Sequence, residues 1–254
     1  MDDAHDRDGA GSPASHGTHP TTSLATEGAP LTAAANERVV LQVLSERYGL
    51  PLDHVDEGET RVVELSSPTA NVQAYALHGG IVAGARPELV DLVREELTGG
   101  PAGARAAMGR IAAHLGGRPI AVANRTGVLI PAPPVKVTVT DAADPRLPEW
   151  VRGYFTGAAW IVADDDGRVL STAVLKRYDD RLREISVGTD ETARGRGLAR
   201  AVVAAAARAV LAEGRAVLYN HEVDNTASAR VAESVGLHEL GILHTVLYEG
   251  SRER

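Results

Sequence analysis

The segment of the chain best suited to chemistry is a short run of glycines and arginines before a predicted helix. Gly195 and Gly197 precede an apolar stretch with helical spacing, and three arginines surround them: Arg194, Arg196 and Arg200. At the start of a helix the first backbone N–H groups lack a partner within the helix and lie at the positive end of its dipole. Glycine leaves these groups open to a ligand. The segment therefore predicts an anion site that suits a diphosphate.

Other phosphate-binding patterns do not fit this segment. The sequence contains no Gly-x-x-x-x-Gly-Lys-Ser/Thr loop. A dinucleotide site would need a third glycine where the chain has Arg200, together with parallel strand–helix–strand units. Strands at 158–163, 168–175 and 182–189 instead follow one another through short turns, which predicts antiparallel pairing.

A strand must run into the segment and a helix must follow it. Leu182–Thr189 is predicted as the strand, and the helix is expected from Gly195 to about Gly214. Beyond it, Ala216–Asn220 is typical of a short strand. A second helix is expected from Asn225 to about Val235, with Gly236 ending it.

The elements before the segment are predicted from residue 135 onward. Val135, Val137 and Val139 alternate with polar residues, which predicts a strand, and a short helix is expected within 145–153. The turn residues Asp164–Gly167 predict a hairpin between the next two strands. With final strands expected over 238–248, the predicted order from residue 135 is strand, helix, three strands, helix, strand, helix, strand.

The first half of the chain contains no catalytic constellation. Residues 1–34 are rich in Asp, Gly, Ser, Thr, Pro and His, and we expect a disordered tail. Residues 35–134 predict a smaller α/β domain, and the prolines of 131–134 predict its boundary. Within it, helices are expected near 39–48, 87–97 and 102–115, and strands at 61–65, 72–77, 119–123 and 128–130, with a turn near Asn124.

Composition excludes several classes of function. The 254 residues carry a net charge of -8, which disfavours a general nucleic-acid binder, and they contain no cysteine, which excludes disulfides and thiolate chemistry. No metal site is expected. No apolar run is long enough to span a membrane, and the N-terminus lacks a secretory signal. We therefore expect a cytoplasmic protein.

Two motifs resemble those of a known family. Arg194-x-x-Gly197-x-Ala199 resembles the Arg/Gln-x-x-Gly-x-Gly/Ala motif of the GNAT superfamily of acyl-CoA-dependent N-acyltransferases. The stretch from Asn225 to Gly236 is similar to that family's second signature. The order of strands and helices is also similar, so that the resemblance covers about residues 135–250.

The resemblance implies a fold and a domain organisation. The fold would be mixed α/β, with a mostly antiparallel twisted sheet flanked by helices. Residues 135–254 would form the acetyltransferase domain, and the smaller α/β domain of residues 35–134 would precede it. That first domain is either a domain of unknown role or a degenerate second copy of the transferase fold, which would serve as a substrate lid or a dimer surface. A homodimer is a further expectation.

The resemblance also implies acetyl-CoA as acyl donor and assigns residues to it. Main-chain groups of Val187 and Thr189 would pair with the pantetheine arm. The N–H groups from Arg194 to Ala199 would hold the pyrophosphate: those of Arg194, Gly195, Arg196, Gly197, Leu198 and Ala199, with Arg200 adding charge. Asn225 and Ser228 would contact the cofactor from the other side; Asn225 could instead be only a helix cap, and the two roles can coexist. A splay between Leu182–Thr189 and Ala216–Asn220 would admit the thioester.

In such enzymes a deprotonated amine attacks the acyl carbonyl directly and the CoA thiolate leaves. The acceptor would be an amine of a small molecule, peptide or protein. The sequence departs from the family at Ala232, where many members have the tyrosine that protonates the thiolate. The remaining candidates for proton transfer are Glu184, Tyr219 and His221, while Glu184 could equally form a surface ion pair with Arg183 or Lys176. The missing tyrosine also supports an alternative, a non-catalytic acyl-CoA-binding regulatory protein.

Overall fold

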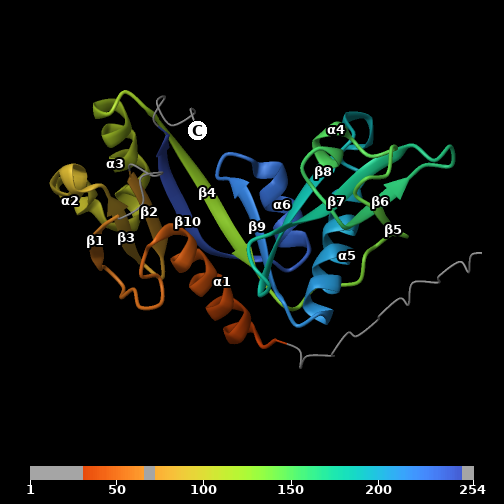
Figure 1. The fold of residues 1–254 in the computed structure, drawn as a ribbon, viewed down its shortest axis with the longest axis horizontal. Helices are drawn as coiled ribbons and strands as arrows, with labels where there is room; N and C mark the ends of the chain where they lie inside the picture. The colour runs from red at the N-terminus through yellow and green to blue at the C-terminus, as the bar shows by residue number, and fades with distance from the viewer. Residues whose placement is uncertain (1–30, 66–71, 248–254) are drawn as a thin grey trace, which may run out of the picture.

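The computed structural model describes residues 31–65 and 72–247, and its central feature is one sheet (Figure 1). Within these residues ten strands form the sheet in the order β1-β3-β2-β10-β4-β9-β8-β7-β6-β5. The strands are β1 (Thr60–Glu64), β2 (Val72–Leu77), β3 (Gly80–Ala85), β4 (Arg118–Thr126), β5 (Thr138–Asp141), β6 (Ala158–Ala163), β7 (Val169–Arg177), β8 (Leu182–Thr189), β9 (Ala216–Glu222) and β10 (His238–Leu247).

Helices cover both faces of this sheet. They are α1 (Ala33–Tyr48), α2 (Val90–Glu96), α3 (Gly100–His114), α4 (Glu149–Arg152), α5 (Leu198–Ala212) and α6 (Thr226–Ser234), with 3-10 turns at Pro87–Leu89, Leu97–Gly99 and Glu191–Ala193. All neighbouring strands pair antiparallel except β1 with β3 and β8 with β9. The predicted fold class, a mixed and mostly antiparallel sheet flanked by helices, is confirmed.

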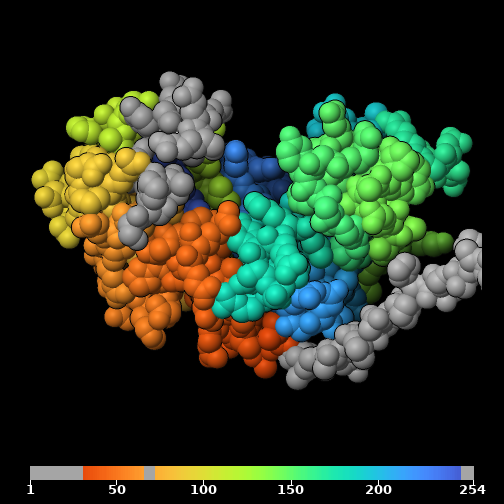
Figure 2. Space-filling model, viewed as in Figure 1, coloured from red at the N-terminus to blue at the C-terminus, as the bar shows by residue number. Residues whose placement is uncertain are grey.

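Side-chain alternation along the strands decides which helix covers which face. Leu218 of β9 lies in the apolar cluster with α1, whereas its neighbours Val217 and Tyr219 lie in the cluster with α5 and α6. Likewise Tyr75 of β2 faces α1, and Ala74 faces α3. Helix α1 therefore covers one face, and α3, α5 and α6 cover the other. The surface is hollowed between α3 and α4, with α6 at the bottom of the hollow (Figure 2).

The sheet runs without a break through both predicted domains. Strand β10, from the end of the chain, pairs with β2 on one side and with β4 on the other, and β4 also pairs with β9. Helix α1 adds a buried link, because Asn36 donates to Thr126 Oγ1 at 2.6 Å and accepts from the N–H of Val217 at 3.2 Å. The division at residue 134 and the proposed second copy of the fold stay predictions.

The predicted order of elements from residue 135 onward matches the structure. The turn of the β6–β7 hairpin includes Gly167 at φ 82°, and Gly49, at φ 67°, ends α1 as its left-handed cap. The predicted tail covers residues 1–34, of which residues 1–30 lie outside the described part of the chain. Helix α1 already begins at Ala33, within the predicted tail.

Several predictions for the first half were wrong. One strand covers residues 118–126, so that Asn124 lies inside it instead of in a turn, and residues 128–130 do not form the predicted strand. The Asn124 amide is accommodated there because its Nδ2 donates to Asn220 Oδ1 on β9 at 2.6 Å. Strand β3 was not predicted at all. It is rich in small residues, and Gly84 is needed because a Cβ would lie 2.5 Å from Leu65 Cδ2.

Candidate functional site

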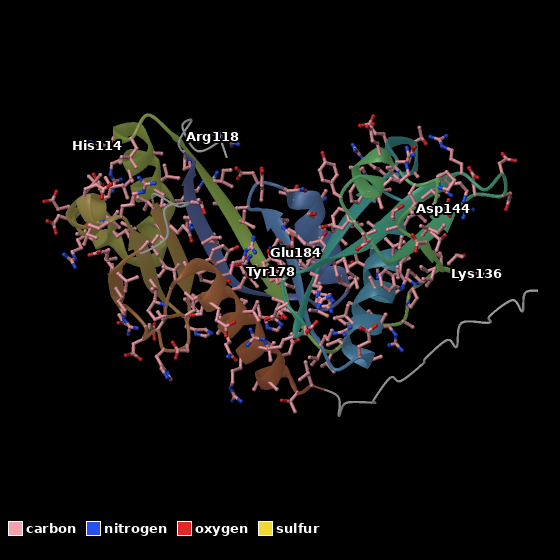
Figure 3. The ribbon with its side chains drawn as sticks, viewed as in Figure 1. His114, Arg118, Lys136, Asp144, Tyr178 and Glu184 are labelled. Carbon is pink, nitrogen blue, oxygen red and sulfur yellow. The ribbon has the colours of Figure 1, made fainter. Side chains whose placement is uncertain are left out.

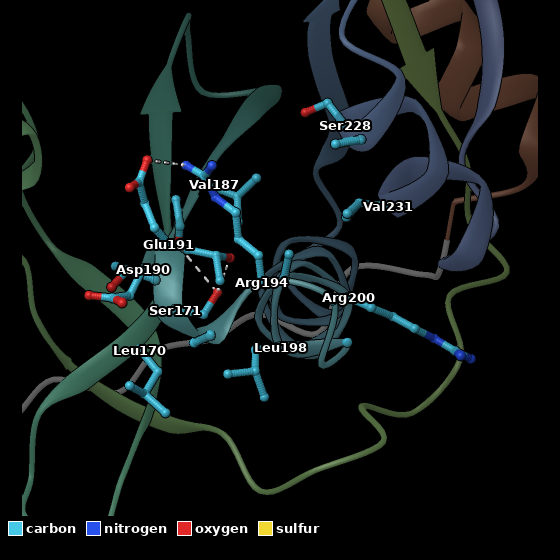
Figure 4. Close-up of a pocket in the computed structure, with 18 of the residues that line it drawn as sticks. Leu170, Ser171, Val187, Asp190, Glu191, Arg194, Leu198, Arg200, Ser228 and Val231 are labelled. Carbon is cyan, nitrogen blue, oxygen red and sulfur yellow. Dashed lines mark hydrogen bonds and ion pairs between the residues drawn. The ribbon is translucent and has the colours of Figure 1, made fainter.

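A large cavity lies where β8 runs into α5. Its volume is about 1040 Å³, and it extends from the start of β7 across the β8–α5 loop to α6 (Figure 4). All but one of the residues predicted to contact the cofactor line it: Val187, Thr189, Arg194, Gly195, Gly197, Leu198, Ala199, Arg200, Asn225 and Ser228. Arg196 is exposed and is not part of the lining.

Backbone N–H groups at the start of α5 face this cavity. Gly197 is the residue before the helix and has φ 75°, and Gly195 has φ 76°, a region that side chains disfavour. No side chain of the described residues caps the helix, and a Cβ at either glycine would meet nothing within 4 Å. Two open turns in front of uncapped amides make a cradle that fits a diphosphate.

Charge around the cradle comes from arginines on both sides of α5. Arg194 and Arg200 both line the cavity and extend from different sides of the helix start (Figure 4). Arg194 is largely exposed and makes an ion pair with Glu191 at 3.4 Å. An exposed pair of this kind is worth little, so Arg194 can turn to a bound phosphate at small cost.

Strands β8 and β9 separate beside this cradle. They pair in parallel from Leu182–Ala216 to Ile185–Tyr219 and no further. Beyond that point β8 stays with β7 as far as Thr189, while β9 stays with β4 as far as Glu222. The separation gives the splay expected from the sequence. Within residues 31–65 and 72–247, no other strand pairs with the edge of β8 that carries Val187 and Thr189.

Helix α6 forms the opposite wall through its cap. The Asn225 side chain accepts from the N–H of Ser228 at 3.0 Å, as a helix cap does, and both residues also line the cavity. The Ser228 hydroxyl lies 3.0 Å from the Tyr219 hydroxyl. Burial raises the pKa of Tyr219, so this phenol keeps its proton at neutral pH and can donate it into the cavity.

The three candidates for proton transfer lie in different places. Tyr219 lines the cavity, whereas Glu184 and His221 do not. Both ring nitrogens of His221 are engaged, because Nε2 accepts from Arg125 Nε at 3.0 Å and Nδ1 therefore donates to the Glu222 carbonyl at 2.9 Å. An imidazole held in this way has no free lone pair with which to act as a base.

Glu184 lies near the centre of the molecule (Figure 3). It is on the α1 face of the sheet, because its hydrogen-bond partner Tyr178 packs against the apolar cluster of α1. It is one residue before the point where β8 and β9 separate. Its carboxylate accepts from the Tyr178 hydroxyl at 2.6 Å and lies 3.8 Å from Lys176 Nζ. The ion pair considered from the sequence is present with Lys176, and the carboxylate is largely buried, so it is not simply a surface group.

Sequence reasoning missed the wall made by β7 and α4. Ser171 Oγ lies 2.9 Å from Thr189 Oγ1, and Thr172 Oγ1 is buried with no partner in the described part of the chain. Trp150 also lines the cavity, and it lies so close to β8 that a Cβ on Gly188 would be 2.7 Å from its ring. A glycine inside a predicted strand is the one sequence signal that could have indicated this close approach.

No helix in residues 31–65 and 72–247 has the length and apolar character needed to cross a membrane. The same residues contain no group of three side chains that could hold a metal ion.

Comparison with known proteins gives a family match over part of the chain. The model of the acetyltransferase (GNAT) family matches residues 130–237. No curated protein matches the sequence.

Among solved structures, a GNAT-family protein from Novosphingobium aromaticivorans is 22% identical, with 52% of this chain and 65% of that one covered and a TM-score of 0.44. A GCN5-related N-acetyltransferase-like protein from Streptococcus suis is 18% identical, with 71% and 85% covered and a TM-score of 0.45. A GCN5-related N-acetyltransferase from Sphaerobacter thermophilus is 16% identical, with 70% of this chain and 60% of that one covered and a TM-score of 0.40. The chain thus spans less than two thirds of the first and third of these proteins.

Proposed function

We propose that the protein moves an acetyl group from acetyl-CoA to an amine of a small molecule or protein, because residues 130–237 match the model of the acetyltransferase (GNAT) family. One observation carries the proposal. Uncapped amides behind Gly195 and Gly197 open into a cavity that reaches the point where β8 and β9 separate. A ligand with a diphosphate at one end and a narrow arm at the other suits this shape.

The cofactor residues act mainly through their backbone. The N–H groups from Arg194 to Ala199 would hold the diphosphate, with Arg200 beside them. Val187 and Thr189 would pair with the pantetheine arm along the free edge of β8, in the manner of an added strand. Acetyl-CoA supplies the activated acyl carbonyl, and Asn225 and Ser228 would close the other side.

Tyr219 is the group best placed to protonate the leaving thiolate. Its hydroxyl lies at the cavity wall and is hydrogen-bonded to Ser228 at 3.0 Å. The position of the tyrosine found in many family members is Ala232, which is fully buried and has no hydroxyl. A phenol on β9 thus takes the place of one on α6, and its raised pKa keeps it protonated until the thiolate forms.

Glu184 is the group best placed to deprotonate the amine. It lies beside the separation of β8 and β9 but on the α1 face, so an acceptor would approach from the face opposite the cofactor cavity. Tyr178 and Lys176 orient and stabilise the carboxylate. Proton transfer from the ammonium form of an acceptor would run through water to Glu184.

Calorimetry with acetyl-CoA and a thiol-release assay across a panel of amines test the proposal. The chain has no cysteine, so every thiol detected comes from released CoA. We expect binding at micromolar concentration, turnover with at least one amine, and a loss of kcat in Glu184→Gln without loss of acetyl-CoA binding. Absence of binding at high micromolar acetyl-CoA would remove the proposal.

The absence of a tyrosine at position 232, which is Ala232, supports an alternative function without catalysis. A non-catalytic acyl-CoA-binding protein would keep the cradle and the splay but would have no acid for the thiolate. It predicts the same calorimetric binding with no thiol release for any amine. Turnover that is lost in Tyr219→Phe would decide for the enzyme.

A further inference from the structure

A second cavity lies at the start of α3, on the same face of the sheet as the first. Its volume is about 530 Å³, and it lies over β2 and β10, between the first turn of α3 and the loop from β9 to α6. Most of its wall is apolar and is made by Ala76, Leu77, Ala121, Val223, Leu240 and Ile242. Four ionisable side chains also reach it: His78, Arg105, Glu239 and His244.

His244 is the unusual member of this lining. Only 5% of the residue is exposed, and its ring has no hydrogen-bond partner among the residues that the structure describes. In the sheet it stands between Ala74 on β2 and Ala121 on β4, and these small neighbours leave room around the ring. The ring nitrogens are not sealed in the core but are open to the cavity, where water or a ligand can bond to them.

The start of α3 gives the same cavity a positive end. No side chain in the described part of the chain caps this 15-residue helix, and Pro101 and Ala102 of its first turn line the cavity. Arg105, one turn further, lines it too, while its guanidinium pairs with both oxygens of Asp224 at 3.0 and 2.7 Å. The helix dipole and the imidazole N–H favour an anionic group, whereas Asp224 neutralises much of the charge of Arg105.

We propose that this cavity binds a small monocarboxylic acid, with its carboxylate held by the α3 start, Arg105 and His244. The compact apolar body of the acid would lie against Ala76, Ala121 and Ile242. Glu239 also lines the cavity, and its carboxylate lies 3.7 Å from Arg125 Nη2. Its negative charge would repel a second carboxylate on the ligand. Ligands with one negative charge are therefore selected over diacids.

This site is distinct from the proposed acetyl-CoA cavity. Val223 lines the second cavity and Asn225 lines the first, so the β9–α6 loop is the wall between them. Arg105 joins this loop from α3 through Asp224. Carboxylate binding at His244 does not depend on the acetyltransferase activity and can be measured without acetyl-CoA.

The test uses 4-methylpentanoate as the probe and its neutral amide, 4-methylpentanamide, as the matched ligand. Calorimetry with the full chain should give a Kd on the order of 1 mM or tighter for the acid and at least about tenfold weaker binding for the amide. In NMR spectra of ring-labelled histidine, the acid should shift the signals that His244→Gln removes. His114→Gln, on the exposed end of α3, is the control and should bind the acid normally.

A second variant keeps the proposal testable if His244→Gln does not fold. Ala102 is exposed at the start of α3, so Ala102→Glu should fold normally and should repel the acid, with at least about a tenfold loss of affinity. The proposal is overturned if about 10 mM acid leaves the His244 signals unmoved, where occupancy should be high. Equal binding of acid and amide, or normal binding to Ala102→Glu, would overturn it as well.

Discussion

The two cavities lie on the same face of the sheet, and each lies at the start of a helix, but they differ in how much negative charge a bound ligand can carry. At α5 every residue of the first turn has an N–H group, and glycines with positive φ keep the approach open. At α3 the first turn contains Pro101, which has no N–H, and carboxylates of Asp224 and Glu239 lie close by. The comparison indicates that the helix dipole alone does not decide which anion can bind. The free amides at the start of α5 suit a diphosphate, whereas the start of α3, with fewer free amides, suits a single carboxylate.

The largest effect is expected from Tyr219→Phe, which tests the chemistry of the α5 cavity alone. Removing the phenol removes the proposed acid, so kcat should fall about 100-fold with KM little changed. Ser228, the partner of the hydroxyl, is partly exposed and can bond to water, so the fold should be kept. The thiol-release assay measures kcat, and circular dichroism checks the fold. An unchanged kcat would remove Tyr219 from the mechanism.

Gly197→Asp should break the cradle while leaving the second cavity intact. Asp tolerates the left-handed backbone but would place a negative charge beside the diphosphate. A repulsion of about 2 kcal/mol corresponds to roughly 30-fold weaker acetyl-CoA binding. Gly197→Asn has nearly the same shape and no charge, and should lose only about threefold. Calorimetry on both variants measures this, and equal losses would mean that shape, not charge, limits binding at α5.

The site at α5 could be predicted from the sequence because its parts are adjacent in the chain. Gly195, Gly197 and the arginines around them follow one another, and the helix cap at Asn225 has a local signature. The predicted strand order of the second half follows from equally local turn chemistry, such as the Asp-rich turn before Gly167.

The second cavity could not be predicted in this way because its parts meet only through the sheet. His244 reaches Arg105 because β10 inserts between β2 and β4, and no local signal in the sequence fixes that insertion. The burial of His244 depends on Ala74 and Ala121, which lie more than a hundred residues away in the sequence. The same non-local pairing explains why Asn124 was misplaced in a turn.

The two cavities should respond differently to pH. Burial, with a smaller effect of Arg105, lowers the pKa of His244, so the free ring is neutral at pH 7. A bound carboxylate favours the imidazolium and raises this pKa, so the complex takes up a proton. Affinity for 4-methylpentanoate should therefore rise about fivefold as the pH falls from 7.5 to 5.5. Calorimetry across this range measures the rise.

The controls for this pH effect lie in both cavities. His244→Gln should abolish the rise in affinity for 4-methylpentanoate, although the other ionisable residues of the lining, His78, Arg105 and Glu239, stay in place. The lining of the α5 cavity contains no histidine within the described ranges, so acetyl-CoA affinity should not rise in the same window. A rise that survives in His244→Gln would assign the proton to another group.

The smallest effect is expected from Asp224→Asn, which tests whether the loop between the cavities couples them. The Arg105–Asp224 pair is exposed on both sides, so its loss should change the free energy of unfolding by less than about 1 kcal/mol. Because Arg105 then has no carboxylate to neutralise it, 4-methylpentanoate should bind about two- to threefold more tightly. Asn225 keeps its own bond to Ser228, so acetyl-CoA affinity should stay within about twofold. Calorimetry with both ligands shows whether the two cavities are independent or coupled. A large loss of acetyl-CoA binding would show that the Arg105–Asp224 ion pair holds the N-terminal cap of α6 in position.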